Sequence, residues 1–320
     1  LVFGIQGYDK RSVSEPSGED NVMGAKDGFI EVVRVNMSLL RRRMKTPQLK
    51  LELFVKGSKS QTDLCLCYMA DRVPQSLIAQ IKARLDEMEL ESILSSGYLQ
   101  PFLENRRGCL FDTVGTTQRP DVLCAKLLEG RVGLLIDGTP FALVIPKLFC
   151  ESFQTMDDYC YRPAYATLVR WIKYAAFLVA VLLPALYVAI ALHHPELLNR
   201  TLLLILADAE ENAPISLTAE AIGVLLVYEI IREAGLRLPK AVGGAVSIVA
   251  GLIIGDAAVA SGLISTPMLT VTAIAVIAGF VVPDLAQSIT LLRLAFLLIA
   301  GFWGLFGISL LGAAVLFNLC

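Results

Sequence analysis

The sequence predicts an α/β cytosolic domain followed by an all-α polytopic membrane domain. Hydrophobic residues make up 55% of the 320, charged residues only 18%, and the mean hydropathy is +0.62. Soluble proteins are roughly half apolar and a quarter charged, so this is not an ordinary soluble chain. The charges are concentrated in residues 1–170, whereas 170–320 is mostly Leu, Ile, Val, Ala and Gly. This asymmetry predicts a soluble part followed by a membrane part.

We place the α/β domain at residues 1–147, a linker helix at 148–167 and the membrane helices at 168–320. The chain begins at Leu1 and closes at Cys320 inside an apolar run. We therefore expect the first part of the α/β domain and a C-terminal tail to be missing.

The soluble half alternates helix and strand patterns. Apolar residues in 27–44 recur with a helical period, and residues 75–89 also indicate a helix. Residues 49–56 and 62–69 alternate as strands do. Residues 131–146 form two apolar runs around an Asp-Gly pair, which predicts a β-hairpin.

Two polar residues, Asn36 and Arg43, lie inside the apolar stripe of the 27–44 helix. Polar groups at such positions need partners. Either they bond internally, or they form an interface in which Arg43 reaches carbonyls or acids of another subunit. The run Arg41–Arg43 fits a solvated helix end better than a lipid or nucleic-acid patch.

Five apolar stretches are candidate membrane segments, against the roughly 20 residues that cross a bilayer. The second contains two glutamates and fits either a span or a half-buried, re-entrant helix; the fourth is short and lies between two prolines. The membrane domain thus has four or five segments. They are 168–192, 215–231, 241–264, 268–282 and 291–317.

Basic residues flank the first segment and the connection between the second and third. They are Arg162, Arg170, Lys173, Arg232, Arg237 and Lys240. Positive residues favour the cytoplasmic side, so the soluble domain is expected in the cytoplasm and residues 193–214 outside.

Several function classes find no support. The net charge of −2 provides no basic field for nucleic acid. Seven scattered cysteines without a C-x-x-C pair indicate free thiols in a reducing compartment. His193, His194 and Glu196 fit interfacial side chains better than a zinc site. No catalytic or nucleotide-binding motif is present, so we predict no enzyme, no cofactor and no metal.

Six stretches of the sequence together match a known pattern: "KRSVSEP" (10–16), "GAKDGFIEVVRVNMSLLRRRM" (24–44), "QRPD" (118–121), "EGRVGLLIDGTPFALVIPKLF" (129–149), "DDYCYRP" (157–163) and "YEIIREAGLRLPKAVGGAVSIVAGLIIGDAAVASGLIS" (228–265). They resemble the A subunit of GerA-type nutrient germinant receptors of bacterial spores. Stage V sporulation protein AF belongs to the same family. The chain departs from the family pattern at Asp256, where an uncharged amide is usual, and at "QRPD", where a Glu-Arg pair is usual.

The resemblance implies a multi-pass subunit of a complex in the spore inner membrane. Its partners would be a transporter-like B subunit and a lipoprotein C subunit. The A subunit would form a homo-oligomer that acts as a ligand-gated channel for monovalent cations and triggers germination. Two alternatives remain: a signal-relay or scaffold subunit without its own pore, and the stage V sporulation protein AF sister, which amplifies ion release.

Asp256 is the main pore candidate, because it places a carboxylate within an apolar segment. Such residues nearly always face a bundle interior or water. Around an axis of several copies it would form a carboxylate ring, as cation pores often do. The alternatives are a protonated Asp bonded to a neighbouring helix, and a position near the membrane interface.

Glu220 and Glu229 are further pore or gating candidates, nine residues apart and on opposite sides of a helix. One can line water while the other pairs with Arg232 or Arg237; Glu233 also pairs with Arg237 at i, i+4 spacing. Small residues in the third segment predict a helix-packing seam within the membrane. They are Ser247, Gly251, Gly255, Ala258 and Gly262. Gly301, Gly304 and Gly307 form a similar edge in the fifth segment.

Overall fold

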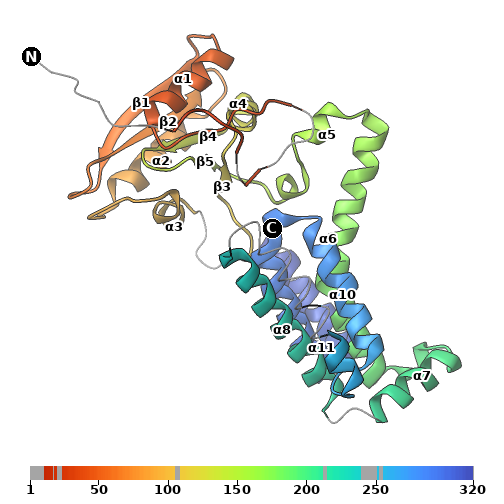
Figure 1. The fold of residues 1–320 in the computed structure, drawn as a ribbon. Helices are drawn as coiled ribbons and strands as arrows, with labels where there is room; N and C mark the ends of the chain where they lie inside the picture. Colours follow the sequence, from red (N-terminus) through yellow and green to blue (C-terminus); the bar gives the residue numbers. More distant parts are fainter. Residues whose placement is uncertain are drawn as a thin grey trace, which may run out of the picture. The chain divides into compact units, whose positions relative to one another are not determined.

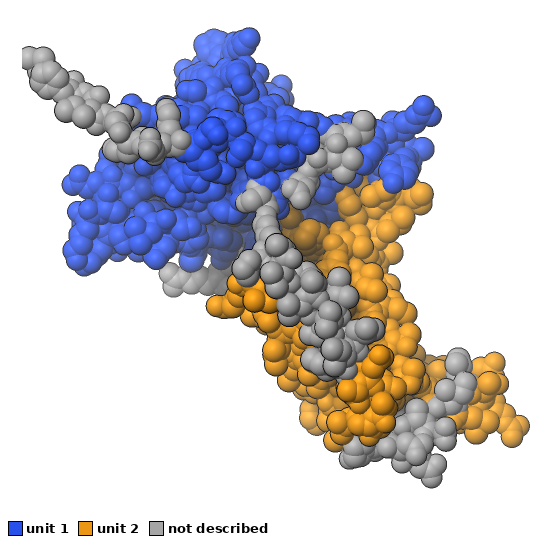
Figure 2. All heavy atoms as spheres, in the orientation of Figure 1, with its two compact units in different colours: residues 1–166 blue, residues 167–320 orange. Residues whose placement is uncertain are grey.

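The computed structural model describes residues 11–16, 18–19, 24–104, 109–211, 215–238, 251 and 255–319. The chain divides into two compact units, residues 1–166 and 167–320, coloured separately in Figure 2. Unit 1 combines a sheet with helices, and the described part of unit 2 is helical. The predicted fold class is therefore confirmed.

The sheet of unit 1 has five strands in the order β1-β2-β4-β5-β3, with every neighbouring pair antiparallel. The two strands predicted at 49–56 and 62–69 are confirmed, as is the hairpin, whose turn contains Gly138 at φ +83°. β3 was not predicted. The strands are β1 (Leu49–Lys56), β2 (Thr62–Met69), β3 (Gly115–Thr117), β4 (Val132–Ile136) and β5 (Ala142–Ile145).

Helices cover both faces of this sheet (Figure 1). α1 (Val33–Arg43) and α4 (Pro120–Leu128) pack on one face, and α2 (Gln75–Asp86) and α3 (Gln100–Leu103) on the other. Successive strand residues point to opposite faces, so alternate residues of β2 join the two separate cores. This two-sided cover is why β4 and β5 are buried along their whole lengths.

The helix predicted from residue 27 begins only at Val33. Two contacts hold the preceding loop out of the helix: the Asn36 amide bonds to both backbone groups of Ile30, and Asp137 Oδ1 accepts the Val33 N–H at 2.9 Å. The carboxylate of Asp137 thus caps α1 from the β4–β5 turn. Similarly, the helix predicted at 75–89 ends at Asp86.

The predicted linker helix over 148–167 is wrong as one continuous helix. The chain instead forms a 3-10 turn, Phe149–Phe153, then α5 (Asp157–Cys160), and α6 starts at Pro163. Tyr161 is extended, with ψ 164°. The helical region is disfavoured for Arg162, the residue directly before Pro163, and proline itself suits the first helical position, so the helix is interrupted here.

The six cysteines in the described part of the chain are free thiols, as predicted. Cys65, Cys67 and Cys124 are buried, while Cys150 and Cys160 are exposed. Burial raises the pKa of the Cys124 thiol to about 11 and raises the pKa of Cys67 well above its usual value.

We expect Cys124 to react with iodoacetamide at least about 100-fold more slowly than Cys150, because the thiolate is the nucleophile. Mass spectrometry after brief alkylation checks this, with denatured protein as the control; equal rates in the native protein would contradict the packing.

In the described part of unit 2, helices α6, α8, α10 and α11 lie together (Figure 1) and share one apolar core. The core contains Val188 of α6, Leu217 and Ala221 of α8, Met268 of α10 and Leu297 of α11. α7 occupies the connection predicted to lie outside and was not expected. The helices are α6 (Pro163–His193), α7 (Arg200–Glu211), α8 (Leu217–Arg237), α10 (Thr266–Phe280) and α11 (Ala286–Leu319).

Among the described helices, two are long and apolar enough to cross a membrane. They are Pro163–His193 and Pro283–Leu319, which contain the first and fifth predicted segments; the mean hydropathy of an 18-residue window is 2.6 in the first helix and 2.3 in the second. α10 is apolar but shorter. Most of the third predicted segment lies outside the described residues, although residues 251 and 255–260 are helical.

α11 is broken in its middle. Gly304 has φ 58° and ψ −143°, a conformation open essentially only to glycine. A side chain there would also collide with another helix, since a Cβ would lie 3.0 Å from Cβ of His193 at the end of α6. Gly301 lies close to α8, where a Cβ would come within 2.6 Å of Thr218. The fifth segment thus uses its glycines for close packing and for one sharp break.

Candidate functional site in the helical unit

Asn36 does not form the predicted interface. Its side chain is buried, its Oδ1 accepts the Ile30 N–H at 2.9 Å, and its Nδ2 donates to the Ile30 carbonyl at 2.6 Å. Both ends of the amide are therefore satisfied inside the chain, the internal alternative. Arg43 is partly exposed and pairs with Asp27, as does Arg42 at 2.5 Å. These arginines complement the carboxyl end of α1, as expected for a solvated helix end.

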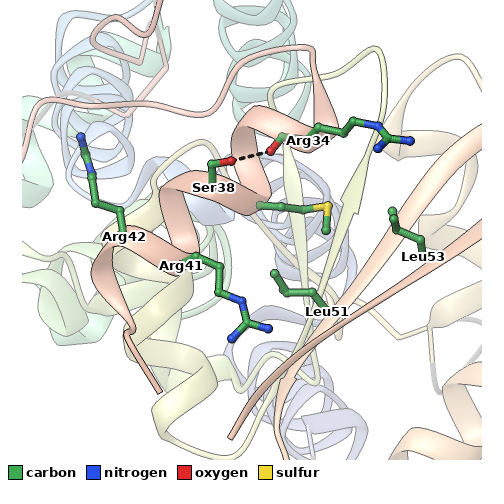
Figure 3. A pocket seen from close by; sticks show the side chains of 7 residues that line it. Arg34, Ser38, Arg41, Arg42, Leu51 and Leu53 are labelled. Atoms are coloured by element: carbon green, nitrogen blue, oxygen red, sulfur yellow. Dashed lines mark hydrogen bonds between the residues drawn. The ribbon is translucent and has the colours of Figure 1, made fainter. Parts of the chain in front are cut away.

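A groove of about 620 Å³ lies between α1 and β1, with Leu51 and Leu53 in its floor. Arg34, Arg41 and Arg42 rim it, but Figure 3 shows their side chains leaving the helix in different directions. Arg41 donates to the Thr46 carbonyl at 3.1 Å. The arginines do not converge on one point, so the groove has no built anion site.

The "QRPD" stretch forms a buried clasp at the start of α4. Arg119 donates from Nε and Nη2 to the two carboxylate oxygens of Asp121, at 3.1 and 2.6 Å, and also to the Ala25 carbonyl at 3.0 Å. The Gln118 N–H and the Thr117 hydroxyl both donate to Glu19 at 2.9 Å. The motif therefore joins the N-terminal segment to the sheet edge.

The prediction that Glu220 faces a pore is wrong. It is 1% exposed, and its Oε1 accepts the backbone N–H and the hydroxyl of Ser265 at 2.6 and 2.7 Å. Ser265 is the N-cap residue directly before α10. Because the first N–H groups of a helix have no partner within the helix, Glu220 caps α10 from the first turn of α8.

Glu229 pairs with Arg232, one of the two predicted arrangements, with an Nη2–Oε2 distance of 2.6 Å. The Thr290 hydroxyl joins them: it donates to Glu229 Oε1 at 3.0 Å and accepts from Arg232 Nη1 at 3.3 Å. The predicted Glu233–Arg237 pair is confirmed at 2.7 Å.

Arg293 is a buried polar residue that sequence reasoning missed. Pro184 lies inside α6 and has no N–H, so the carbonyl four residues earlier, that of Ala180, loses its helical partner. Arg293 Nε donates to this carbonyl at 2.8 Å, and its Nη2 donates to the Ala275 carbonyl at 3.2 Å. Gly279 leaves room, because a Cβ there would lie 3.3 Å from Nη2. A lone arginine in the fifth segment and a proline in the first were the available signals.

A cavity of about 120 Å³ brings these polar residues together between α8, α10 and α11. Glu229, Arg232, Thr290 and Arg293 line it, with Tyr228 from α8. The other lining residues are Val276, Gly279, Phe280, Pro283, Ala286 and Ile289.

Asp256 is exposed, and in the described part of the chain its carboxylate has no hydrogen-bond or ion-pair partner. It lies four residues before the last helical residue, Ala260, or about 6 Å along the axis. Gly262, two residues further on, terminates the helix: its φ is +70°, and the Leu263 N–H bonds to the Ala258 carbonyl at 3.1 Å. Asp256 is thus close to a helix end rather than at the middle of the segment.

The packing seam is only partly described, since Ser247 lies outside the described residues. A Cβ on Gly251 would meet nothing described within 4 Å, and one on Gly255 would reach only Leu269, at 3.9 Å. The prediction that Gly262 is a helix-packing position is wrong, because its positive φ makes it the residue that terminates the helix.

His194 Nδ1 lies 3.1 Å from Glu196 Oε1, and the described residues contain no group of three metal-ligating side chains.

Comparisons with known proteins agree on one family. Residues 1–320 match the family model described as Bacillus/Clostridium GerA spore germination protein. Spore germination protein KA of Bacillus subtilis is 38% identical, covering 100% of this chain and 59% of that protein. The membrane protein YfkQ of Bacillus subtilis is 38% identical (100% and 63% covered), and GerLA of Bacillus cereus 33% (97% and 63%).

The chain is also similar to a solved structure, the N-terminal domain of the A subunit of the Bacillus megaterium spore germinant receptor GerK3. It is 38% identical and covers 38% of this chain and 97% of its own, with a TM-score of 0.32. The chain spans about three fifths of the curated relatives that it matches. Because the family model matches every residue and relatives above 30% identity cover the whole chain, this protein belongs to the GerA family of spore germination proteins.

Proposed function

We propose that this chain is the A subunit of a nutrient-responsive germinant receptor in the spore inner membrane. Unit 1 lies on the cytoplasmic side, and several copies of unit 2 surround a path for monovalent cations. The family match supports the receptor role, and two long apolar helices support the membrane location. The partners are a transporter-like B subunit, a lipoprotein C subunit and membrane lipid.

The observation that carries the channel proposal is the exposed carboxylate of Asp256, which is unpartnered within the described residues. A carboxylate on a membrane helix is unfavourable against lipid, so water or another copy of the chain must meet it. Its place near the helix end lowers this cost and fits the mouth of a pore. A ring of such carboxylates attracts cations.

The open surface at Gly251 and Gly255 supports the assembly of several copies. Small residues let helix backbones approach closely in lipid, and the described part of this chain does not fill the space beside either glycine. A neighbouring copy of the chain is the occupant that we propose.

The relay alternative is favoured by one observation. Glu220 and Glu229 are both bonded within the chain, so Asp256 is left as the single pore candidate. A relay or scaffold subunit, or a protein of the stage V sporulation protein AF type, would need no carboxylate ring.

Ion flux through the reconstituted complex tests the proposal. We expect Asp256→Asn to lower cation flux about tenfold and Asp256→Lys to abolish it, because charged rings raise the local ion concentration by ~10–1000-fold. The matched control is Glu196→Lys, which reverses an exposed charge in the 193–214 connection. Unchanged flux and selectivity in Asp256→Lys would favour the relay alternative.

A further inference from the structure

The cavity between α8, α10 and α11 contains more positive than negative charge. Its lining has two guanidinium groups, Arg232 and Arg293, and one carboxylate, Glu229. Glu229 pairs with Arg232. Arg293 is 4% exposed and, among the described residues, bonds only to the carbonyls of Ala180 and Ala275. The two guanidinium groups therefore share one carboxylate, and the described lining carries a net positive charge, an unfavourable state inside a membrane domain.

Hydrogen-bond donors are also in excess there. Arg232 Nε is buried and has no acceptor within the described ranges. The Thr290 hydroxyl accepts from Arg232 and donates to Glu229, so its donor is occupied. A guanidinium has five N–H donors and no acceptor. The cavity thus lacks acceptors and a negative charge, and an oxyanion supplies both.

The volume of the cavity and the aromatic residues at its opening indicate which class of ligand it can bind. A space of about 120 Å³ holds a small polar group, since one water needs only ~10–15 Å³. At the mouth, the 62% exposed Phe280 ring lies 6.5 Å from the Tyr228 ring. A cationic interior with an apolar, aromatic mouth suits a phosphate attached to hydrocarbon chains. Basic pockets between membrane helices bind lipid head groups in this way.

We infer that this cavity binds one phosphate group, with Arg232 and Arg293 as its hydrogen-bond donors. Arginine matches phosphate oxygens in geometry as well as charge. The phosphate is that of an anionic phospholipid, and free phosphate is the second source to be distinguished. The inference needs the membrane location and does not depend on ion conduction.

Thermal unfolding of the full-length protein in nanodiscs tests this. Three conditions are compared: phosphatidylcholine alone, phosphatidylcholine with a minor fraction of phosphatidylglycerol, and phosphatidylcholine with inorganic phosphate in the buffer. We expect phosphatidylglycerol to raise the midpoint by about 5 °C, as saturating binding to the folded state does.

Three variants separate the site from general membrane electrostatics. Arg232→Gln removes the excess positive charge and is expected to lose the shift. Glu229→Gln removes the one carboxylate and is expected to enlarge it. Arg237→Gln is the matched control, because Arg237 lies on the same helix, is exposed and pairs with Glu233 outside the cavity; its shift should equal the wild-type shift.

Each result of the nanodisc experiment leads to a different conclusion. A phosphatidylglycerol shift with this variant pattern supports the lipid source, and the same pattern with inorganic phosphate alone supports the site with free phosphate as ligand. No shift in either condition, or equal shifts in Arg232→Gln and Arg237→Gln, overturns the inference. If Arg232→Gln does not fold, Glu229→Gln decides: a shift no larger than that of the wild type overturns it.

Discussion

Replacing Asp121 with alanine is expected to destabilise the edge of unit 1 by about 3–5 kcal/mol. Removing one partner of a buried ion pair leaves the other charge uncompensated, and such losses are of this size. Arg119 is 4% exposed, and within the described residues its guanidinium would keep only the bond to the Ala25 carbonyl. Hydrogen exchange of the amides in β3 and α4, read as opening free energies, measures the effect.

The matched control is Lys59→Ala, which breaks an exposed pair with Glu91 and should cost less than about 1 kcal/mol. The double variant Arg119→Met with Asp121→Leu should recover part of the loss, because apolar replacements of a buried pair avoid the unpaired charge. A cost for Asp121→Ala no greater than that for Lys59→Ala would contradict the clasp.

Replacing Glu220 with alanine is expected to destabilise unit 2 by about 3–5 kcal/mol. Two hydrogen bonds to a carboxyl group contribute about 1.5–3 kcal/mol each, and Ser265 would keep an unpaired N–H and hydroxyl in a buried site. The unfolding midpoint of the protein in nanodiscs should fall by about 10 °C.

Two variants show whether the acceptor oxygen is the cause. Glu220→Gln retains an acceptor and should cost a third of that amount or less. Glu233→Ala, on the same helix but exposed, should change stability by less than about 0.5 kcal/mol. An equal loss in Glu220→Gln and Glu220→Ala would show that the capping bonds are not responsible.

Elements with local causes could be predicted from the sequence. β1 and β2 matched residue for residue, because alternation and the turn between them, with Gly57 at φ +91°, are both local features. The start of α1 could not be predicted, because the cap on Val33 comes from Asp137, far along the chain. Asp137 was visible in the sequence only as a turn residue.

Polar contacts between neighbouring residues could likewise be predicted, whereas those between distant residues could not. The sequence predicted that one of the two glutamates pairs with Arg232 or Arg237, and the structure selects Glu229–Arg232, since residues three apart meet on a helix surface. Glu220 and Ser265 are 45 residues apart, and Arg293 and Ala180 are 113 apart, so no periodicity connects them. Pro184 does show which carbonyl is freed, but only the packing of α6 against α11 shows which donor reaches it.

The break at Gly304 also determines how much of α11 a bilayer would have to accommodate in the proposed membrane location. An unbroken helix over Ala286–Leu319 would extend about 51 Å, far beyond the ~30 Å hydrocarbon thickness. Residues 286–303 alone extend about 27 Å, and Trp303 lies directly before the break, where an indole ring favours the head-group layer. Residues 305–319 turn back beside the first half of the helix, because a Cβ on Gly307 would lie 2.5 Å from the Ile299 side chain, eight residues earlier. They therefore add nothing to the length that a bilayer would have to accommodate.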